Sequence, residues 1–266
     1  MAHDSRTSAA ADHIVGRSIS KVFASNDGPV EALRDVSFQI CQGEFVSMLG
    51  PSGCGKSTLM LLVAGLEAPT AGEISVGQQR VQAPVTDVGI VFQEHGLYEW
   101  RTILENIMLQ AEVRGLPLAE FEVRARELLQ RTGLADFASK YPHELSGGMR
   151  QRASICRALV HDPSLLLFDE PFGALDALTR VQMQIDLEKI WLRRKPTVLF
   201  ITHSIAEAVA LSDRVIIMSP RPGQIDATLT IDLPRPRNKA VLAGKPFADY
   251  CEALTERFMA NGTLKY

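Results

Sequence analysis

Four short apolar runs dominate the hydrophobic pattern of this 266-residue chain. Each is nearly free of charged and polar residues, unlike a half-exposed strand, in which apolar and polar positions alternate. Uninterrupted runs of this length are typical of strands in a parallel sheet that helices cover on both faces. The pattern therefore predicts an α/β fold with a mainly parallel sheet. The runs are FVSML at 45–49, VGIVF at 88–92, LLLF at 165–168 and VLFI at 198–201.

Polar side chains follow the last three of these runs. Gln93 comes directly after the second run, Asp169 and Glu170 after the third, and His203 shortly after the fourth. In open α/β sheets, ligands bind outside the carboxyl ends of the strands. We therefore expect these side chains to share one sheet edge with the segment that begins at Gly50. A lone glutamine or histidine in such a place is more often a solvated or structural residue, so the prediction depends on their convergence.

A different pattern, in which apolar and polar residues alternate, occupies the N-terminal part of the chain. It extends from residue 14 to residue 40 and is interrupted by the turn sequence N-D-G-P at 26–29. Alternation on both sides of a turn predicts an antiparallel hairpin. Shorter strands are expected at 73–76 and around Val81.

Residues 93–157 have the composition and spacing of helices. Apolar residues recur three and four positions apart, and Gly115, Pro117 and Gly133 separate the segments. We expect a helical lobe of about seventy residues beside the sheet. The predicted helices are Thr102–Gln110, Leu118–Thr132 and Met149–Val160.

The pattern changes again after Gly223. Pro234 and Pro236 indicate a stiff linker. Apolar residues at helical spacing then predict a helix from about Pro246 to Asn261. We expect this helix to fold back on the sheet rather than to form a regulatory module.

The strongest chemical signal lies directly after the first apolar run. Residues 50–58 read G-P-S-G-C-G-K-S-T and match G-x-x-x-x-G-K-[ST], a phosphate-binding loop. Its glycines let successive backbone N–H groups point at one anion, and the helix that follows favours negative charge at its N-terminus. A Gly-rich turn without a ligand is the alternative, and the K-S-T sequence argues against it. The residues expected to hold the phosphates are Gly50, Pro51, Ser52, Gly53, Cys54, Gly55, Lys56, Ser57 and Thr58.

A second Gly-rich helix start lies inside the helical lobe. Residues 145–149 read L-S-G-G-M, in which Ser146 is a good N-cap and Gly147 and Gly148 expose backbone N–H groups ahead of a helix. By itself the segment would be an ordinary capped helix. Together with the phosphate loop it predicts a composite nucleotide pocket, either within one chain or between two chains.

Composition narrows the class of protein. The net charge of −3 gives no basic face of the kind that nucleic-acid binding needs, so we expect no nucleic-acid partner. The first residues lack the apolar segment of a secretory signal, and the sequence contains no run of about 18 apolar residues, which a bilayer-spanning helix would need. The four cysteines have no C-x-x-C spacing, which argues against a zinc site and a disulfide framework. We expect a cytosolic chain with reduced thiols.

The motifs in this order resemble the ATP-binding subunit of an ABC transporter: the phosphate loop, Gln93, L-S-G-G-M, LLLFDE, G-A-L-D at 173–176 and His203. The resemblance extends from about residue 14 to residue 223. It implies a P-loop NTPase (ABC ATPase) fold with an N-terminal antiparallel β subdomain and an inserted helical subdomain. A single ABC ATPase domain would cover 14–266: a nucleotide-binding core (14–92 and 158–222), a helical signature subdomain (93–157) and a C-terminal linker and helix (223–266). Residues 1–13 would be flexible.

The resemblance also implies roles for residues around ATP and Mg²⁺. Lys56 would reach the β- and γ-phosphates, Ser57 would ligate Mg²⁺ directly, and Asp169 would hold it through water. Glu170 would act as general base towards the attacking water, and His203 would bond the γ-phosphate and hold Glu170 or the water in place.

Three further roles follow from the same resemblance. Gln93 would contact Mg²⁺ or water and report the γ-phosphate to the transporter. Phe23 stands where the family usually stacks a tyrosine on adenine, and phenylalanine keeps the π-face but loses the hydroxyl. Asp176 would cross the interface of a dimer.

In the family, two chains pair head to tail, with two ATP molecules between them. The phosphate loop of one chain then faces the signature of the other, here Ser146, Gly147, Gly148 and Met149. Met149 stands where the family most often has glutamine. Because Ser146 and the backbone donors are kept, we expect little loss of ATP binding.

Three stretches further resemble the ATPase subunits of nitrate, sulfonate and taurine importers. They are F-Q-E-H-G-L-Y-E-W-R-T-I-L-E-N-I from residue 92, M-S-P-R-P-G-Q-I from residue 218 and D-L-P-R-P-R from residue 232. The resemblance implies a peripheral protein at the cytoplasmic face of the inner membrane. Its partners would be integral membrane permease subunits and, indirectly, a periplasmic or lipid-anchored solute-binding protein.

A short permease helix would dock near 94–107, where Tyr98 and Trp100 are expected to form a socket, unless these two rings simply pack within the helical lobe. Three alternatives remain open. They are an exporter ATPase subunit, a non-transport ABC ATPase that works on DNA or ribosomes, and a P-loop kinase.

Overall fold

A six-stranded sheet forms the centre of the molecule in the computed structural model, which describes residues 11–26 and 28–260. The strand order is β10-β9-β3-β8-β7-β6. All neighbouring pairs are parallel except β10 with β9, so the prediction of an α/β fold with a mainly parallel sheet is confirmed. The strands are β3 (Phe45–Leu49), β6 (Val88–Val91), β7 (Leu165–Asp169), β8 (Thr197–Thr202), β9 (Arg214–Met218) and β10 (Ile225–Thr230).

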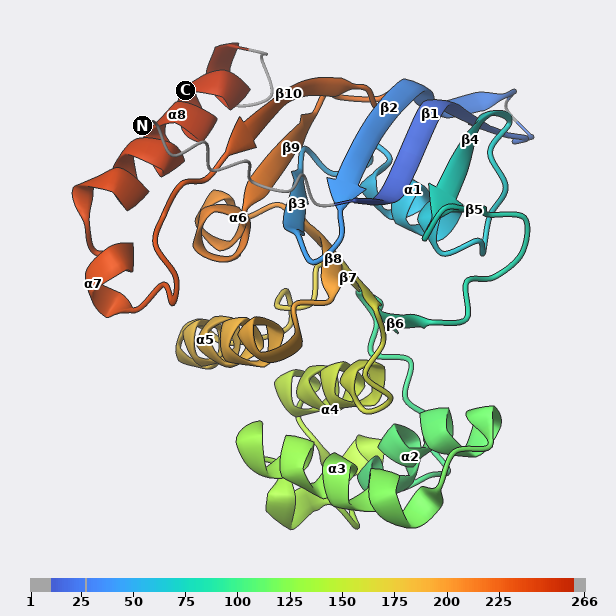
Figure 1. Cartoon of the computed structure of the whole chain (residues 1–266), viewed down its shortest axis with the longest axis vertical. Coiled ribbons are helices and arrows are strands. Elements are labelled where there is room, and N and C mark those ends of the chain that lie inside the picture. The colour runs from blue at the N-terminus through green and yellow to red at the C-terminus, as the bar shows by residue number, and fades with distance from the viewer. Residues whose placement is uncertain (1–10, 27, 261–266) are drawn as a thin grey trace, which may run out of the picture.

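A second, antiparallel sheet lies beside the first, at the upper right of Figure 1. Its order is β2-β1-β4-β5, and β1 and β2 form the expected hairpin. β1 begins at Asp12, which pairs with Cys41, so residues 12 and 13 belong to a strand instead of a flexible lead; residues 1–10 lie outside the described part of the chain. The strands are β1 (Asp12–Phe23), β2 (Val30–Cys41), β4 (Ala71–Val76) and β5 (Gln79–Arg80).

The helices gather in three places. α1 (Lys56–Val63) follows the phosphate loop and contacts both sheets. α2 (Ile103–Arg114), α3 (Leu118–Arg131) and α4 (Gly147–Leu159) form the helical lobe at the bottom of Figure 1, with two short 3-10 helices between α3 and α4. The other helices are α5 (Ala177–Arg194), α6 (Ile205–Leu211), α7 (Lys239–Leu242) and α8 (Lys245–Ala260).

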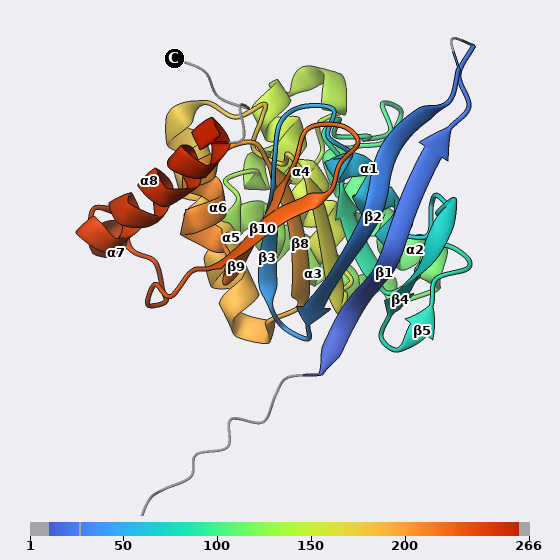
Figure 2. The same ribbon diagram turned by 90° about the horizontal axis from the view of Figure 1, so that it is seen from above.

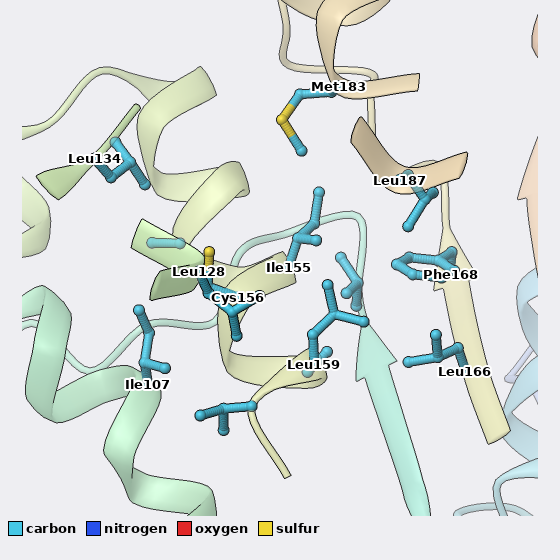
Figure 3. Packing of buried hydrophobic residues seen from close by; sticks show 14 of the residues in the cluster. Ile107, Leu128, Leu134, Ile155, Cys156, Leu159, Leu166, Phe168, Met183 and Leu187 are labelled. Atoms are coloured by element: carbon cyan, nitrogen blue, oxygen red, sulfur yellow. The ribbon is translucent and has the colours of Figure 1, made fainter. Parts of the chain in front are cut away.

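The apolar runs are continuous because both faces of the central sheet are buried. In β7, Leu165 and Leu167 belong to the core shared with α1 and the antiparallel sheet. Leu166 and Phe168 point to the opposite face, where they meet α4 and α5 (Figure 3). Each such side chain contributes about 1.5–3 kcal/mol by leaving water. Burial on both faces thus accounts for the lack of alternation in these strands.

The segment after Gly223 differs from the expected linker and helix. It contributes β10, which adds an antiparallel edge to the central sheet. The residues that follow, 231–238, form a strap, here called the C-terminal strap, that leads to α7 and α8 (Figure 2). α8 contacts α6, which agrees with the expectation that this helix folds back on the sheet domain. The predicted end of that helix, Asn261, lies outside the described residues.

Two arginines fix the C-terminal strap in the protein interior. Arg237 is only 3% exposed, and its guanidinium donates to the carbonyl of Ser212 at 2.7 Å. Arg235 forms an ion pair with Glu188 at 3.0 Å and lies over the ring of Trp191. Burial, aided by the charge of Arg235, lowers the pKa of Arg237 to about 10. The motif D-L-P-R-P-R is therefore a structural anchor.

Among residues 11–26 and 28–260, none of the helices has both the length and the apolar character that a transmembrane span requires.

Candidate active site

The phosphate loop turns sharply between β3 and α1. Gly53 and Gly55 have φ angles of 75° and 97°, in the left-handed region that side chains disfavour. A Cβ atom on Gly55 would lie 2.8 Å from the carbonyl oxygen of Ala32, so the loop also approaches β2 too closely for any other residue. The sequence therefore needs glycine here for backbone shape and for space.

Lys56 is the first residue of α1 and is only 5% exposed. Its ammonium group donates to the carbonyl oxygens of Gly50 at 2.8 Å and Pro51 at 2.9 Å. The charge is thus held inside the curve of the loop, next to the N–H groups at the start of α1. This arrangement suits an anion with several negative oxygens.

Ser57 and Asp169 come together at the end of β7. Asp169 is 7% exposed and accepts a hydrogen bond from the Ser57 side chain. Burial raises the pKa of Asp169, while the Ser57 hydrogen bond acts in the opposite direction. A hydroxyl beside a carboxylate is a donor set that fits Mg²⁺, which takes one or two protein oxygens and completes its shell with water and phosphate oxygens.

Glu170 and His203 face each other across the ends of β7 and β8. His203 Nδ1 lies 3.1 Å from Glu170 Oε2. Glu170 adopts a left-handed backbone with φ of 46°, a conformation that costs a non-glycine residue about 1–2 kcal/mol. Its N–H donates to the carbonyl of Ile201 at 2.9 Å, which fixes the turn. Backbone strain of this kind is concentrated at functional sites.

A buried network below His203 was not foreseen from the sequence. Thr202 Oγ1 donates to Glu207 Oε2 at 2.6 Å, and the N–H of Ser204 donates to Thr202 Oγ1 at 3.0 Å. Arg180 on α5 lies 3.7 Å from Glu207, whose pKa is raised by burial. The network holds the turn that carries His203. Its sequence signal is Ser204 as the N-cap of α6 with Glu207 three residues later.

Lys56, Ser57 and Glu170 line one open hollow of about 430 Å³, whereas Asp169 and His203 lie behind Ser57 and Glu170 and do not line it. One wall consists of the phosphate loop, and Gln93 and Glu170 also line it. The facing wall is mostly apolar and includes Phe23, whose ring lies against the Lys21 ammonium at 4.7 Å. The structure therefore brings the strand-end side chains and the phosphate loop to one sheet edge. The full lining is Phe23, Val30, Ala32, Ser52, Gly53, Gly55, Lys56, Ser57, Thr58, Gln93, Glu170 and Arg221.

The signature segment does not line this hollow, and neither does Asp176. Ser146 caps α4, where its Oγ accepts the N–H of Met149 at 3.3 Å. Asp176 caps α5 in the same way, and its pKa is lowered mainly by a side-chain hydrogen bond with Thr179. A Cβ atom on Gly148 would lie 3.1 Å from Leu175, so the signature and the G-A-L-D segment are neighbours.

α4 links the signature to the segment around Gln93. The buried Gln151 side chain donates to the carbonyl of Phe92 at 3.3 Å. Further along α4, Arg157 donates to the carbonyls of His95 at 2.9 Å and Gly96 at 2.6 Å. α4 is therefore hydrogen-bonded to the backbone on both sides of Gln93.

Comparison with known proteins agrees with this geometry. Residues 33–173 match the family model described as ABC transporter. The chain belongs to the ABC transporter family. It is accordingly an ABC ATPase, and its P-loop NTPase fold and ATP binding follow from the same match.

Relatives in this family cover most of the chain. An aliphatic sulfonates import ATP-binding protein of Bacillus cereus is 44% identical over 247 residues, which is 93% of this chain and 96% of that protein. An uncharacterized ABC transporter ATP-binding protein of Methanocaldococcus jannaschii is 45% identical over 221 residues, 83% of each chain.

Solved structures of ABC ATPases resemble the fold. The dimeric structure of MJ0796, a bacterial ABC transporter cassette, is 32% identical and superposes with a TM-score of 0.75, covering 82% of this chain and 98% of that one. A second structure of the same cassette is a dimeric post-hydrolysis state bound to ADP and Pi, with 31% identity and the same TM-score and coverage.

Proposed function

We propose that this ABC ATPase is the ATP-hydrolysing subunit of an importer and binds MgATP at a composite interface between two copies of the chain. The observation that carries the proposal is the single sheet edge at which a phosphate loop, a Ser57–Asp169 pair and a Glu170–His203 pair meet. These groups serve phosphate binding, metal binding and water activation respectively, which are the three needs of phosphoryl transfer to water.

ATP would lie across the hollow with its base towards Phe23 and its phosphates in the loop. Lys56 and the backbone N–H groups of residues 53–58 would bind the β- and γ-phosphates. Ser57, Asp169 and Gln93 would hold Mg²⁺ directly or through water, and the ion would neutralise charge on the phosphate oxygens.

Hydrolysis would use Glu170 as the general base. Its carboxylate lines the hollow beside Ser57 and is only partly exposed, so it can accept a proton from a water molecule aimed at the γ-phosphate. His203, 3.1 Å away, would orient that carboxylate and bond the γ-phosphate. The strained backbone of Glu170 fixes the direction of its side chain before ATP arrives.

A second copy of the chain would complete the site. Ser146, Gly147, Gly148 and Met149 are exposed or half-exposed and do not line the hollow of their own chain. Their N–H groups at the start of α4 are suited to the γ-phosphate held by another chain. The dimeric cassettes of similar fold support this arrangement, in which Asp176 would cross the interface.

A membrane permease would bind beside Tyr98 and Trp100. Trp100 is 74% exposed and stacks near Tyr98, with ring centroids 4.9 Å apart. Tyr98 lines an open, largely apolar hollow of about 660 Å³ together with Leu66, Phe92 and Val113. Trp100 is not part of this lining but lies beside it through its contact with Tyr98. The exposure of both rings supports a role in docking over packing inside the helical lobe. An amphipathic permease helix would fit this groove.

The transported solute is assigned by similarity. Relatives are named as importers of aliphatic sulfonates, which supports a solute of the nitrate, sulfonate or taurine type. On this proposal the chain works at the cytoplasmic face of the cell membrane, and a solute-binding protein delivers the solute to the permease. An exporter subunit and a non-transport ATPase are the competing functions.

Two measurements test the proposal. The purified chain should hydrolyse ATP with Mg²⁺ and without an added acceptor, whereas a kinase would need an acceptor molecule.

In cells, the chain should co-purify with an integral membrane protein. Trp100→Glu should abolish that co-purification and leave hydrolysis by the isolated chain unchanged, while Val123→Glu, at an exposed position on α3 outside the groove, should affect neither. Co-purification with DNA or ribosomes instead of a permease would contradict the importer assignment.

A further inference from the structure

One charged residue of the hollow has no role in the mechanism described above. Arg221 lies in the loop between β9 and β10, within the sequence M-S-P-R-P-G-Q-I, and lines the hollow together with the phosphate loop and Phe23. Among the described residues of this loop, Arg221 is the one that lines the hollow. The sequence M-S-P-R-P-G-Q-I is one of the three stretches that resemble importer subunits. The hydrogen bonds described above for the C-terminal strap do not involve it.

The loop around Arg221 is fastened to two walls of the hollow. The N–H of Gly223 donates to the carbonyl of Ala32 at 2.9 Å, and the Gly223 carbonyl accepts the N–H of Arg34 at 3.1 Å. A Cβ atom on Gly223 would lie 1.9 Å from the carbonyl oxygen of Cys54, so the loop touches the phosphate loop directly. Gly223 is thus wedged where β2 meets the phosphate loop.

The turn is also closed on itself. The N–H of Ser219 donates to the carbonyl of Gln224 at 2.9 Å, and the N–H of Gln224 donates to Ser219 Oγ at 3.0 Å. The backbone that carries Arg221, two residues before Gly223, is therefore fixed relative to both walls. A ligand that binds to Arg221 therefore needs to order little of the backbone of this loop.

The position of Arg221 corresponds to one part of a nucleotide. Phe23, Val30 and Ala32 form the apolar wall, which suits the base, and residues 52–58 form the wall that suits the terminal phosphates. Gly223 contacts both walls at their junction. The group of a nucleotide that lies between its base and its terminal phosphates is the 5′ end of the ribose with the α-phosphate.

The side chain of Arg221 is available for such a contact. It is exposed, and it makes no hydrogen bond or ion pair with any of residues 11–26 and 28–260. A guanidinium carries only donors and matches phosphate oxygens in a two-pronged geometry. Lys56, the other cation of the lining, is turned into the curve of its own loop, so Arg221 is the exposed cation of the described lining.

We propose that Arg221 is a nucleotide-binding residue that donates to the α-phosphate of the bound nucleotide. The inference rests on the proposed binding of MgATP in this hollow. Because the α-phosphate is present in substrate and product and does not react, the contact stabilises ATP, ADP and the transition state equally. It therefore affects affinity without affecting the chemical step.

The test compares Arg221→Ala with the wild-type chain. We expect the dissociation constants of ATP and ADP, measured by calorimetry, to rise by the same factor of about ten. KM for ATP should rise in parallel, and kcat at saturating ATP should stay within about twofold. Arg221→Lys should lie between the two because it keeps the charge and loses the fork. Gln224→Ala, in the same loop but outside the hollow, should bind as the wild type does.

The possible outcomes separate this inference from the proposed function. If Lys56→Ala abolishes binding while Arg221→Ala leaves both dissociation constants unchanged, the inference is wrong and the proposed site stands. If neither variant affects binding, the proposed site itself is wrong. Weakened ATP binding with unchanged ADP binding would place the guanidinium at the γ-phosphate, and a fall in kcat at constant KM would make it a catalytic contact. Either result would overturn the assignment to the α-phosphate.

Discussion

The starts of α1 and α4 are both Gly-rich helix N-termini, but they are built very differently. At α1, the charge of Lys56 is buried within the curve of the loop, and two walls enclose the space above it. At α4, the Ser146 hydroxyl accepts the N–H of Met149, and among the described residues nothing lies within 4 Å of a Cβ atom added to the half-exposed Gly147. One start is a pocket and the other an open surface. This difference is what the proposed dimer requires, in which the second start would serve a ligand held by another chain.

The largest expected effect concerns a residue on the pocket side. Glu170→Gln should lower ATP hydrolysis by about 10²–10⁴-fold while ATP binding is kept, because the amide cannot accept the proton of the attacking water. Turnover and nucleotide affinity should be measured on the same preparation. Glu73→Gln, at a half-exposed position of β4 outside the hollow, is a matched control that should change neither. Near-normal turnover in Glu170→Gln would remove this residue from the mechanism.

A change on the open side should separate binding from turnover. Ser146→Arg should leave the affinity of the isolated chain for ATP unchanged and reduce hydrolysis by about a hundredfold or more, because donors aimed at developing charge are lost. Loss of ATP binding by the isolated variant would mean that the signature completes the pocket of its own chain. The comparison between the two helix starts would then fail.

The complementary change on the pocket side should affect binding itself. Lys56→Ala removes the buried charge beside the phosphates, and we expect ATP affinity to fall about a hundredfold, to the limit of detection by calorimetry. Lys189→Ala on α5, at an exposed position outside the hollow, serves as the control. A Lys56→Ala chain that binds ATP normally would show that the charge of the loop is dispensable.

The smallest expected effect concerns the apolar wall. Phe23→Ala should raise the dissociation constant of ATP about three- to tenfold, since an aromatic contact contributes about 0.5–1.5 kcal/mol beyond burial. Phe23→Tyr should bind at least as well as the wild type because the π-face is kept. An unchanged affinity in Phe23→Ala would place the base elsewhere in the hollow.

Much of the central sheet could be predicted because its signal is local. Runs such as LLLF identify buried strands on their own, and a polar residue directly after such a strand lies at the ligand edge of the sheet by topology alone. The signal of the phosphate loop is equally local, because the spacing of its glycines, Lys56 and Ser57 by itself predicts phosphate binding. These features need no knowledge of distant contacts.

Other features depend on long-range contacts and could not be predicted. β10 has a polar, half-exposed sequence, IDATLT, and becomes a strand only because β9 offers it a partner edge. The burial of Arg237 requires carbonyl groups from α6 and the residues after it, which no local pattern indicates. For the same reason, Arg221 appears next to the phosphate loop only once Gly223 is placed against Cys54.

Our central claim is that the open signature of one chain completes the pocket of another. The molecular mass of the Glu170→Gln chain in the presence of ATP tests this claim most directly. Because this variant binds ATP without consuming it, ATP should convert it from one chain to two in analytical ultracentrifugation. Adding Ser146→Arg to the same chain should keep it at the mass of one chain although ATP is bound. The claim would be contradicted if the Glu170→Gln chain remained a single chain at saturating ATP while the wild type hydrolysed ATP at a rate independent of protein concentration.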